Sequence, residues 1–129
     1  MKILDCYNRS TYPVWGGDPQ GRVDIPIPVH PRTGDDDYLR AVEAGLEKME
    51  DLAQGCRLLI YNAGTDVYQD DKLGGLRLTR EGVNRRDLLV LEFARKQNLP
   101  ILALASGGYS TMSATLLADF ATAVLHSKA

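Results

Sequence analysis

The sequence predicts an α/β fold in which helices cover a parallel sheet. Short apolar runs at residues 58–61 and 101–105 have the length of strands that are buried on both faces of such a sheet. Between and after them lie segments with apolar residues every three or four positions, which is the helical period. Strands and helices that alternate at these lengths indicate parallel strands joined by right-handed crossovers. With 129 residues, the chain fits a single domain with its own core.

The amino-terminal third carries weaker strand signals. We expect a first strand at residues 3–7, followed by a long irregular connection at residues 16–37, which are rich in glycine, proline and aspartate. Apolar residues alternate at positions 23–29, but two prolines there remove ladder donors. That segment is therefore predicted to be an edge strand or an extended surface segment.

Three amphipathic helices are predicted. The first begins at the acidic run 35–37, which is typical of a helix start. The second is capped by Thr79 and ended by Pro100, because a Thr side chain accepts from a free N–H and a proline cannot continue the helix. The last two helices are expected at residues 80–97 and 111–126.

Composition argues against several classes of function. The net charge is −2, from 15 basic and 17 acidic residues that are mixed along the chain, so no basic stripe suggests binding to nucleic acid. No apolar run approaches the ~20 residues that cross a bilayer, and no signal peptide is visible, so we expect a nuclear or cytoplasmic protein without membrane contact. The two cysteines, Cys6 and Cys56, are widely separated, which favours reduced buried thiols over a disulfide or a cysteine metal site.

Asp66 is a candidate metal ligand. It ends the segment NAGTD at 62–66, which follows the strand at 58–61, and Gly64 permits a tight bend that would point its carboxylate into a crevice. The alternative is an ordinary turn or cap aspartate, which is common after a strand.

Tyr109 is a candidate catalytic residue. Gly107 and Gly108 precede it and would let the backbone approach a ligand, while a tyrosine phenol in a dry site donates to a developing oxyanion. The glycine pair equally suits a simple turn, and the tyrosine equally suits packing at a helix start. In a further alternative, the N–H groups at this helix start, with Ser110 and Thr111, cradle a phosphate.

These candidates are expected to lie at one edge of the sheet. If the strands at 58–61 and 101–105 are parallel neighbours, the loops at 64–66 and 107–109 open on the same side, where ligands bind in open α/β sheets. The two histidines add nothing there: His30 lies in the proline-rich connection and His126 near the chain end, so both are interpreted as solvated surface residues.

Several motifs taken in order resemble the histone deacetylases, and most closely the class IV, eleven-type members. The similarity begins with DCYNR at 5–9, Tyr12-Pro13 and DDYL at 36–39. It continues through LIYNAGTD at 59–66, DKLGGL at 71–76, Arg86-Asp87 and SGGY at 106–109. It extends over nearly the whole chain.

The resemblance implies a parallel-sheet arginase/deacetylase-like fold and the hydrolysis of acyl groups from lysine side chains through a Zn²⁺-activated water. Asp66 matches a zinc-binding aspartate of the family, and Tyr109 matches the tyrosine that stabilises the oxyanion. The substrate would be an acyl-lysine protein such as a histone tail, and eleven-type enzymes favour long fatty acyl groups. The residues that match the walls of the acyl-lysine channel are Gly107, Gly108, Leu73 and Tyr12.

The chain departs from the family pattern at its start. The family's Asp-x-His zinc ligands and its His-His general acid/base pair lie upstream of a segment that resembles residues 2–7. We therefore interpret residues 1–129 as the carboxyl-terminal part of a deacetylase catalytic domain, with an incomplete zinc site and little activity alone. Exposed apolar surface and oligomerisation are expected. The alternative is a small α/β module that binds an anion or a protein without catalysis.

Overall fold

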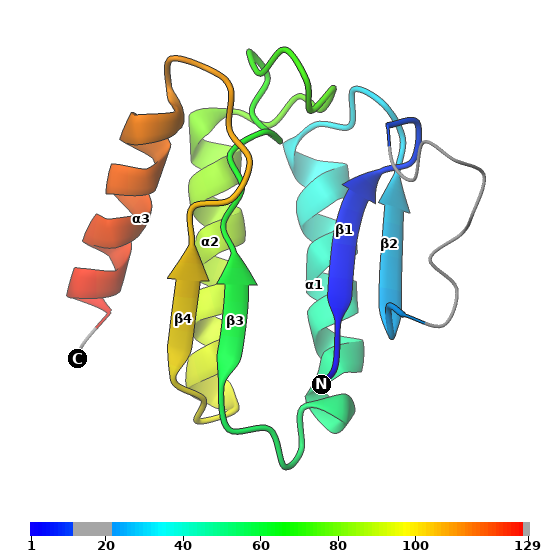
Figure 1. Ribbon diagram of the computed structural model, residues 1–129, viewed down its shortest axis with the longest axis vertical. Helices are drawn as coiled ribbons and strands as arrows, with labels where there is room; N and C mark the ends of the chain where they lie inside the picture. Colours follow the sequence, from blue (N-terminus) through cyan, green and yellow to red (C-terminus); the bar gives the residue numbers. More distant parts are fainter. Residues whose placement is uncertain (12–21, 128–129) are drawn as a thin grey trace.

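A computed structural model describes residues 1–11 and 22–127. Four strands run in one direction, with α1 and α2 packed behind them and α3 beside β4 (Figure 1). The elements in chain order are β1 (Leu4–Asn8), β2 (Ile25–Val29), α1 (Asp35–Leu52), β3 (Leu59–Asn62), α2 (Arg80–Lys96), β4 (Ile101–Leu104) and α3 (Ser113–His126). The predicted elements are thus present, with ends displaced by one or two residues at most positions.

The strands form two parallel pairs, β1 with β2 and β3 with β4. Within the segment at 23–29, residues Ile25–Val29 therefore form a strand, and the positions of its prolines are compatible with this pairing. Pro26 and Pro28 are exposed and alternate with Ile25, whose N–H donates to the Ile3 carbonyl. Because alternate residues of a parallel strand face its neighbour, the prolines cost this pairing no donor.

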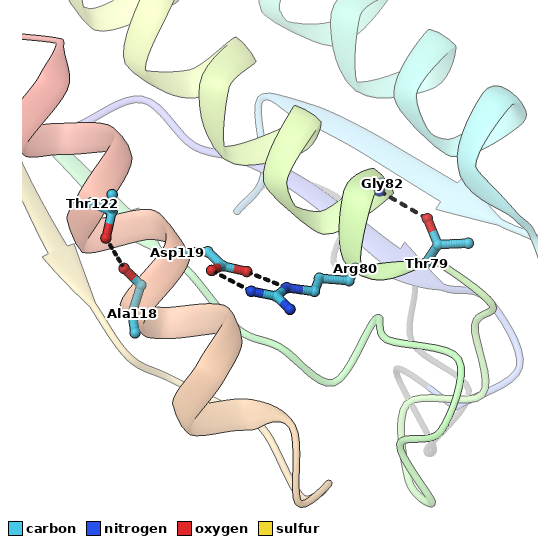
Figure 2. Close-up of polar contacts among 6 residues, drawn as sticks. All are labelled: Thr79, Arg80, Gly82, Ala118, Asp119 and Thr122. Atoms are coloured by element: carbon cyan, nitrogen blue, oxygen red, sulfur yellow. Dashed lines mark hydrogen bonds and ion pairs between the residues drawn. The ribbon is translucent and has the colours of Figure 1, made fainter.

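The starts of α1 and α2 are tied together by side chains. The Thr79 hydroxyl accepts from the Gly82 N–H, as its predicted role as a cap requires (Figure 2). The Asp35 carboxylate in turn accepts from the Thr79 N–H at 2.8 Å and from its hydroxyl at 2.6 Å. A β-carbon at Gly82 would lie 2.0 Å from an Asp35 oxygen, so the contact requires a glycine there. The acidic run at 35–37 thus starts one helix and anchors the next.

Polar and apolar contacts fix α3 against the rest of the chain. Arg80 donates two hydrogen bonds to the Asp119 carboxylate, at 2.7 and 2.8 Å, which joins α2 to α3 (Figure 2). On the inner side, Leu116 and Phe120 are buried, and the Phe120 ring meets Tyr61 of β3 edge-on. These contacts bring the residues that precede α3 to the end of β3.

The prediction that both β3 and β4 are buried on two faces is wrong. Ile60, Leu102 and Leu104 are 58%, 48% and 45% exposed, and they share the face that is opposite the helices. An apolar run shows that a strand has two apolar faces, but not that the described residues cover both of them. The expectation of exposed apolar surface is confirmed. No helix among the described residues is long and apolar enough to span a membrane.

Candidate functional site

The loops after β3 and β4 meet at the carboxyl edge of this strand pair. Pairing continues past the strands, because the Ala63 N–H donates to the Leu104 carbonyl at 2.8 Å and the Thr65 N–H donates to the Gly107 carbonyl at 2.6 Å. The prediction that segments 64–66 and 107–109 open on one edge is therefore confirmed, and it follows directly from the parallel pairing.

Asp66 is half-buried among glycines. A β-carbon at Gly107 would lie 2.9 Å from one carboxylate oxygen of Asp66, and one at Gly64 would lie 3.1 Å from the other. At Gly74 a β-carbon would lie 1.6 Å from the Asp66 carbonyl oxygen. These glycines let three backbone segments approach a single aspartate, which gives each a physical reason beyond turn formation.

The environment of Asp66 disfavours its charged form. Burial raises the pKa of Asp66 above its ordinary value, and the nearby charge of Asp71 raises it further. Arg86 acts in the opposite direction, but more weakly. A carboxylate held without full compensation is typical of functional sites more than of structural turns.

Tyr109 has a fixed main chain, and the residue is 60% exposed. Its N–H donates to the Asp71 carboxylate at 2.7 Å. The preceding Gly108 packs against Thr65 and Ser113, whose hydroxyls are hydrogen-bonded at 2.9 Å, and a β-carbon at Gly108 would overlap both side chains. The phenol thus projects from an anchored loop.

The predicted channel residues are only partly brought together. Gly107 and Gly108 lie beside Asp66 and Thr65, and Leu73, which is 62% exposed, lies in the neighbouring turn. Tyr12 lies outside the described residues. His30 and His126 are both exposed, as expected.

A buried ion pair on α2 supports the loop that carries Asp66. Arg86 donates to the Gly64 carbonyl at 2.7 Å and to the Asp87 carboxylate at 2.8 and 3.0 Å. The Tyr61 hydroxyl donates to the same Asp87 oxygen. Burial raises the pKa of Tyr61, so its phenol stays protonated as a donor. Arg86 of α2 therefore holds the loop that carries Asp66 in place.

The described residues do not by themselves form a zinc site. Catalytic zinc ordinarily takes three protein ligands, and in residues 1–11 and 22–127 no cluster of three His, Cys, Asp or Glu side chains is placed to hold a metal. Asp66 is one suitable oxygen ligand. Asp71, which is also close, is engaged by backbone N–H groups.

The supporting residues had no role assigned from sequence, although signals for them exist. Arg86 and Asp87 fall on the same helical stripe as the buried Val83 and Val90, which marks a buried charge pair. The Asp71 carboxylate accepts hydrogen bonds from the N–H groups of Leu73 and Gly74, two and three residues further along the chain. This is the geometry of an aspartate-stabilised turn.

A family model described as the histone deacetylase domain matches residues 2–126. The chain belongs to the histone deacetylase family. It is 41% identical to Histone deacetylase 2 of Arabidopsis thaliana over 119 residues, which make up 91% of this chain and 30% of the plant protein. It is also 32% identical to an uncharacterized protein of Picosynechococcus over 91 residues, or 69% of this chain and 29% of that protein.

Solved structures show which fold this histone deacetylase segment adopts. An acetylpolyamine aminohydrolase from Burkholderia pseudomallei superposes with a TM-score of 0.73 at 20% identity, covering 96% of this chain and 36% of that one. The HD domain of HDA15 superposes with a TM-score of 0.58 at 23% identity, covering 78% of this chain and 28% of the other. The predicted deacetylase-like α/β fold is confirmed, and the chain spans about a third of the proteins that share it.

Replacing Arg86 tests the support beneath the loop. Arg86→Leu should lower the free energy of unfolding by about 3–5 kcal/mol, because it leaves the buried Asp87 carboxylate without its cation. Urea denaturation followed by circular dichroism measures this. The matched control is the exposed neighbour Arg85, for which Arg85→Leu should change stability by less than about 0.5 kcal/mol. Equal effects from the two variants would contradict this account of the ion pair.

Replacing Asp66 tests its electrostatic environment in chain kept free of metal with a chelator. Because folding raises the pKa of Asp66, folding favours the protonated carboxyl over the carboxylate. The contribution of Asp66 to stability is therefore fully present below the ordinary pKa of 3.8 and is lost as pH rises through the pKa of the folded chain. Asp66→Asn should therefore raise the urea midpoint at pH 7, and the gain should shrink as pH is lowered toward 4. The exposed neighbour Asp70 supplies the control, Asp70→Asn, with no such trend. Destabilisation of Asp66→Asn at pH 7 would count against the raised pKa.

Proposed function

We propose that this chain forms part of a zinc-dependent deacylase that removes acyl groups from lysine side chains. The observation that carries the proposal is the meeting of two loops at one strand edge. One loop holds a half-buried carboxylate with a raised pKa, and the other holds an anchored tyrosine with an exposed phenol. Membership of the histone deacetylase family supports hydrolase chemistry at this edge.

The roles proposed for individual residues come from the family resemblance, and the placement of the described ones at one strand edge supports them. Tyr109 donates a hydrogen bond from its phenol to the oxyanion that develops as the acyl carbonyl is attacked. Leu73, Gly107 and Gly108 border the acyl-lysine channel, and Tyr12 is proposed for its wall from the resemblance alone. Asp66 supplies one ligand of a zinc site whose other ligands lie outside the described residues.

The finer assignments rest on the resemblance and belong to the same proposal. They are class IV membership, a position in the carboxyl-terminal part of the catalytic domain, and acetyl or longer fatty acyl groups on proteins such as histone tails. Work in the nucleus or cytoplasm without direct contact to nucleic acid or membrane is likewise proposed. Because the described residues lack a zinc site of their own, chain 1–129 alone is proposed to be nearly inactive.

A second candidate is an interaction module without catalysis. It is favoured by the exposed apolar row on β3 and β4, formed by Ile60, Leu102 and Leu104, which suits association with a second copy or another protein. The anion-binding variant of this idea has less support. The N–H of Met112 donates to the Ser110 hydroxyl and the N–H of Ser113 to the Ser110 carbonyl, so these donors are already used.

A chimaera tests the deacylase proposal. The 119 matched residues would replace the corresponding segment of Arabidopsis Histone deacetylase 2, and hydrolysis of acetyl-lysine and myristoyl-lysine peptides would be measured. The chimaera should be active, and Tyr109→Phe should lower kcat about 10²- to 10³-fold through loss of the oxyanion donor. Asp66→Asn should abolish activity, while the control Asp70→Asn should retain it.

Three outcomes would overturn separate parts of this proposal. A folded chimaera without activity would favour the interaction module. An active chimaera in which Tyr109→Phe retains full kcat would remove the role of the phenol. Chain 1–129 alone, assayed with added zinc, should stay near the background rate, and Tyr109-dependent hydrolysis by the isolated chain would overturn the proposed inactivity.

A further inference from the structure

Asp71 is a buried carboxylate that connects two separate loops. Its side chain lies in the turn between β3 and α2, and the residue is 7% exposed. One oxygen accepts from the N–H groups of Leu73 and Gly74, both at 2.9 Å. The other oxygen accepts from the N–H of Tyr109 at 2.7 Å, across 38 residues of sequence. Three backbone donors therefore converge on one side chain.

These hydrogen bonds account for the burial of the charge. None of the salt bridges among the described residues involves Asp71. A buried carboxylate without a cationic partner is costly unless N–H donors compensate it, and bonds from N–H groups to an ionised acceptor are about twice as strong as neutral ones. The geometry of both loops is thus set by the requirement to satisfy one buried group.

Each oxygen of Asp71 holds the backbone beside a different exposed residue. The first holds the turn from which Leu73 projects, and the second holds the main chain of Tyr109. The same turn brings Gly74 against the carbonyl of Asp66, and the Asn8 side chain donates to the Gly74 carbonyl at 3.0 Å. The turn is therefore itself fixed to β1, and it provides a rigid reference for the Tyr109 loop.

We propose that Asp71 is a positioning residue, which sets the place of Tyr109 relative to Leu73 and Asp66 through its hydrogen bonds to the backbone. It touches neither substrate nor reacting atoms. The inference rests on the proposed function in one respect, namely that Tyr109 and Leu73 face the acyl-lysine substrate. The distance across the channel, and hence the acyl group that fits, then depends on a residue outside the channel.

The unmodified chain 1–129 allows a direct test. In uniformly ¹⁵N,¹³C-labelled protein, scalar coupling across hydrogen bonds should connect the amide nitrogens of Leu73, Gly74 and Tyr109 to the single carboxyl carbon of Asp71. If Leu73 and Gly74 show this coupling and Tyr109 does not, the proposal fails. The measurement needs no substrate and no variant that has to fold.

Asp71→Asn separates positioning from general support of the fold. An amide keeps one oxygen for Leu73 and Gly74, but it presents an NH₂ group where Tyr109 needs an acceptor. Amide exchange should become about ten- to a hundredfold faster at Tyr109, as expected for a lost bond to a charged group, with little change at Leu73 and Gly74. Asp70→Asn, at the exposed neighbouring aspartate, should change none of the three.

The outcomes distinguish this inference from the proposed function. Equal acceleration at all three amides would indicate a merely structural role in the turn, and unchanged exchange at Tyr109 would also overturn the proposal. Because exchange is read without substrate, either result leaves the deacylase proposal standing. An inactive chimaera, conversely, would leave the hydrogen bonds of Asp71 as measured.

Discussion

The buried Arg86–Asp87 pair is the interaction on which the arrangement of this edge depends. Two adjacent charges on α2 are 6% and 2% exposed, and burial of such groups is tolerated only when their hydrogen bonds are satisfied. The partners that satisfy them are Tyr61 on β3 and the Gly64 carbonyl just beyond it. The helix layer thereby fixes the end of β3, and Tyr61 carries the constraint onward to Phe120 of α3.

Beyond the end of β3, backbone pairing and two buried polar side chains, Thr65 and Asp71, fix the positions of the site loops. The Gly64 loop pairs with Gly107, the Thr65 hydroxyl meets Ser113, and Asp71 holds the N–H of Tyr109. The residues proposed for chemistry differ from these supporting groups. Asp66 has a pKa raised by burial, and the Tyr109 phenol is exposed. Functional groups that are held in place by hydrogen-bonded supporting residues are the arrangement expected of a preorganised site.

The sequence predicts this edge well where the signal is local. The apolar runs at 58–61 and 101–105, the glycines that follow them and the Thr79 cap are each determined by a few neighbouring residues. The supporting contacts depend on residues that are far apart, such as Arg86 and Gly64 at 22 positions or Asp71 and Tyr109 at 38. A hydrophobic pattern carries no information on such pairs. It also cannot show that the outer face of β3 is uncovered, because that depends on which segments pack there.

The most direct test of the central claim is nuclear Overhauser spectroscopy on labelled chain 1–129. The claim is that the loops after β3 and β4 form one site around Asp66. Because a β-carbon at Gly107 would lie 2.9 Å from the Asp66 carboxylate, cross-peaks should join the Asp66 β-protons to the Gly107 α-protons. Their absence in a chain whose β3–β4 cross-peaks are present would contradict the account, since it would place the two loops apart.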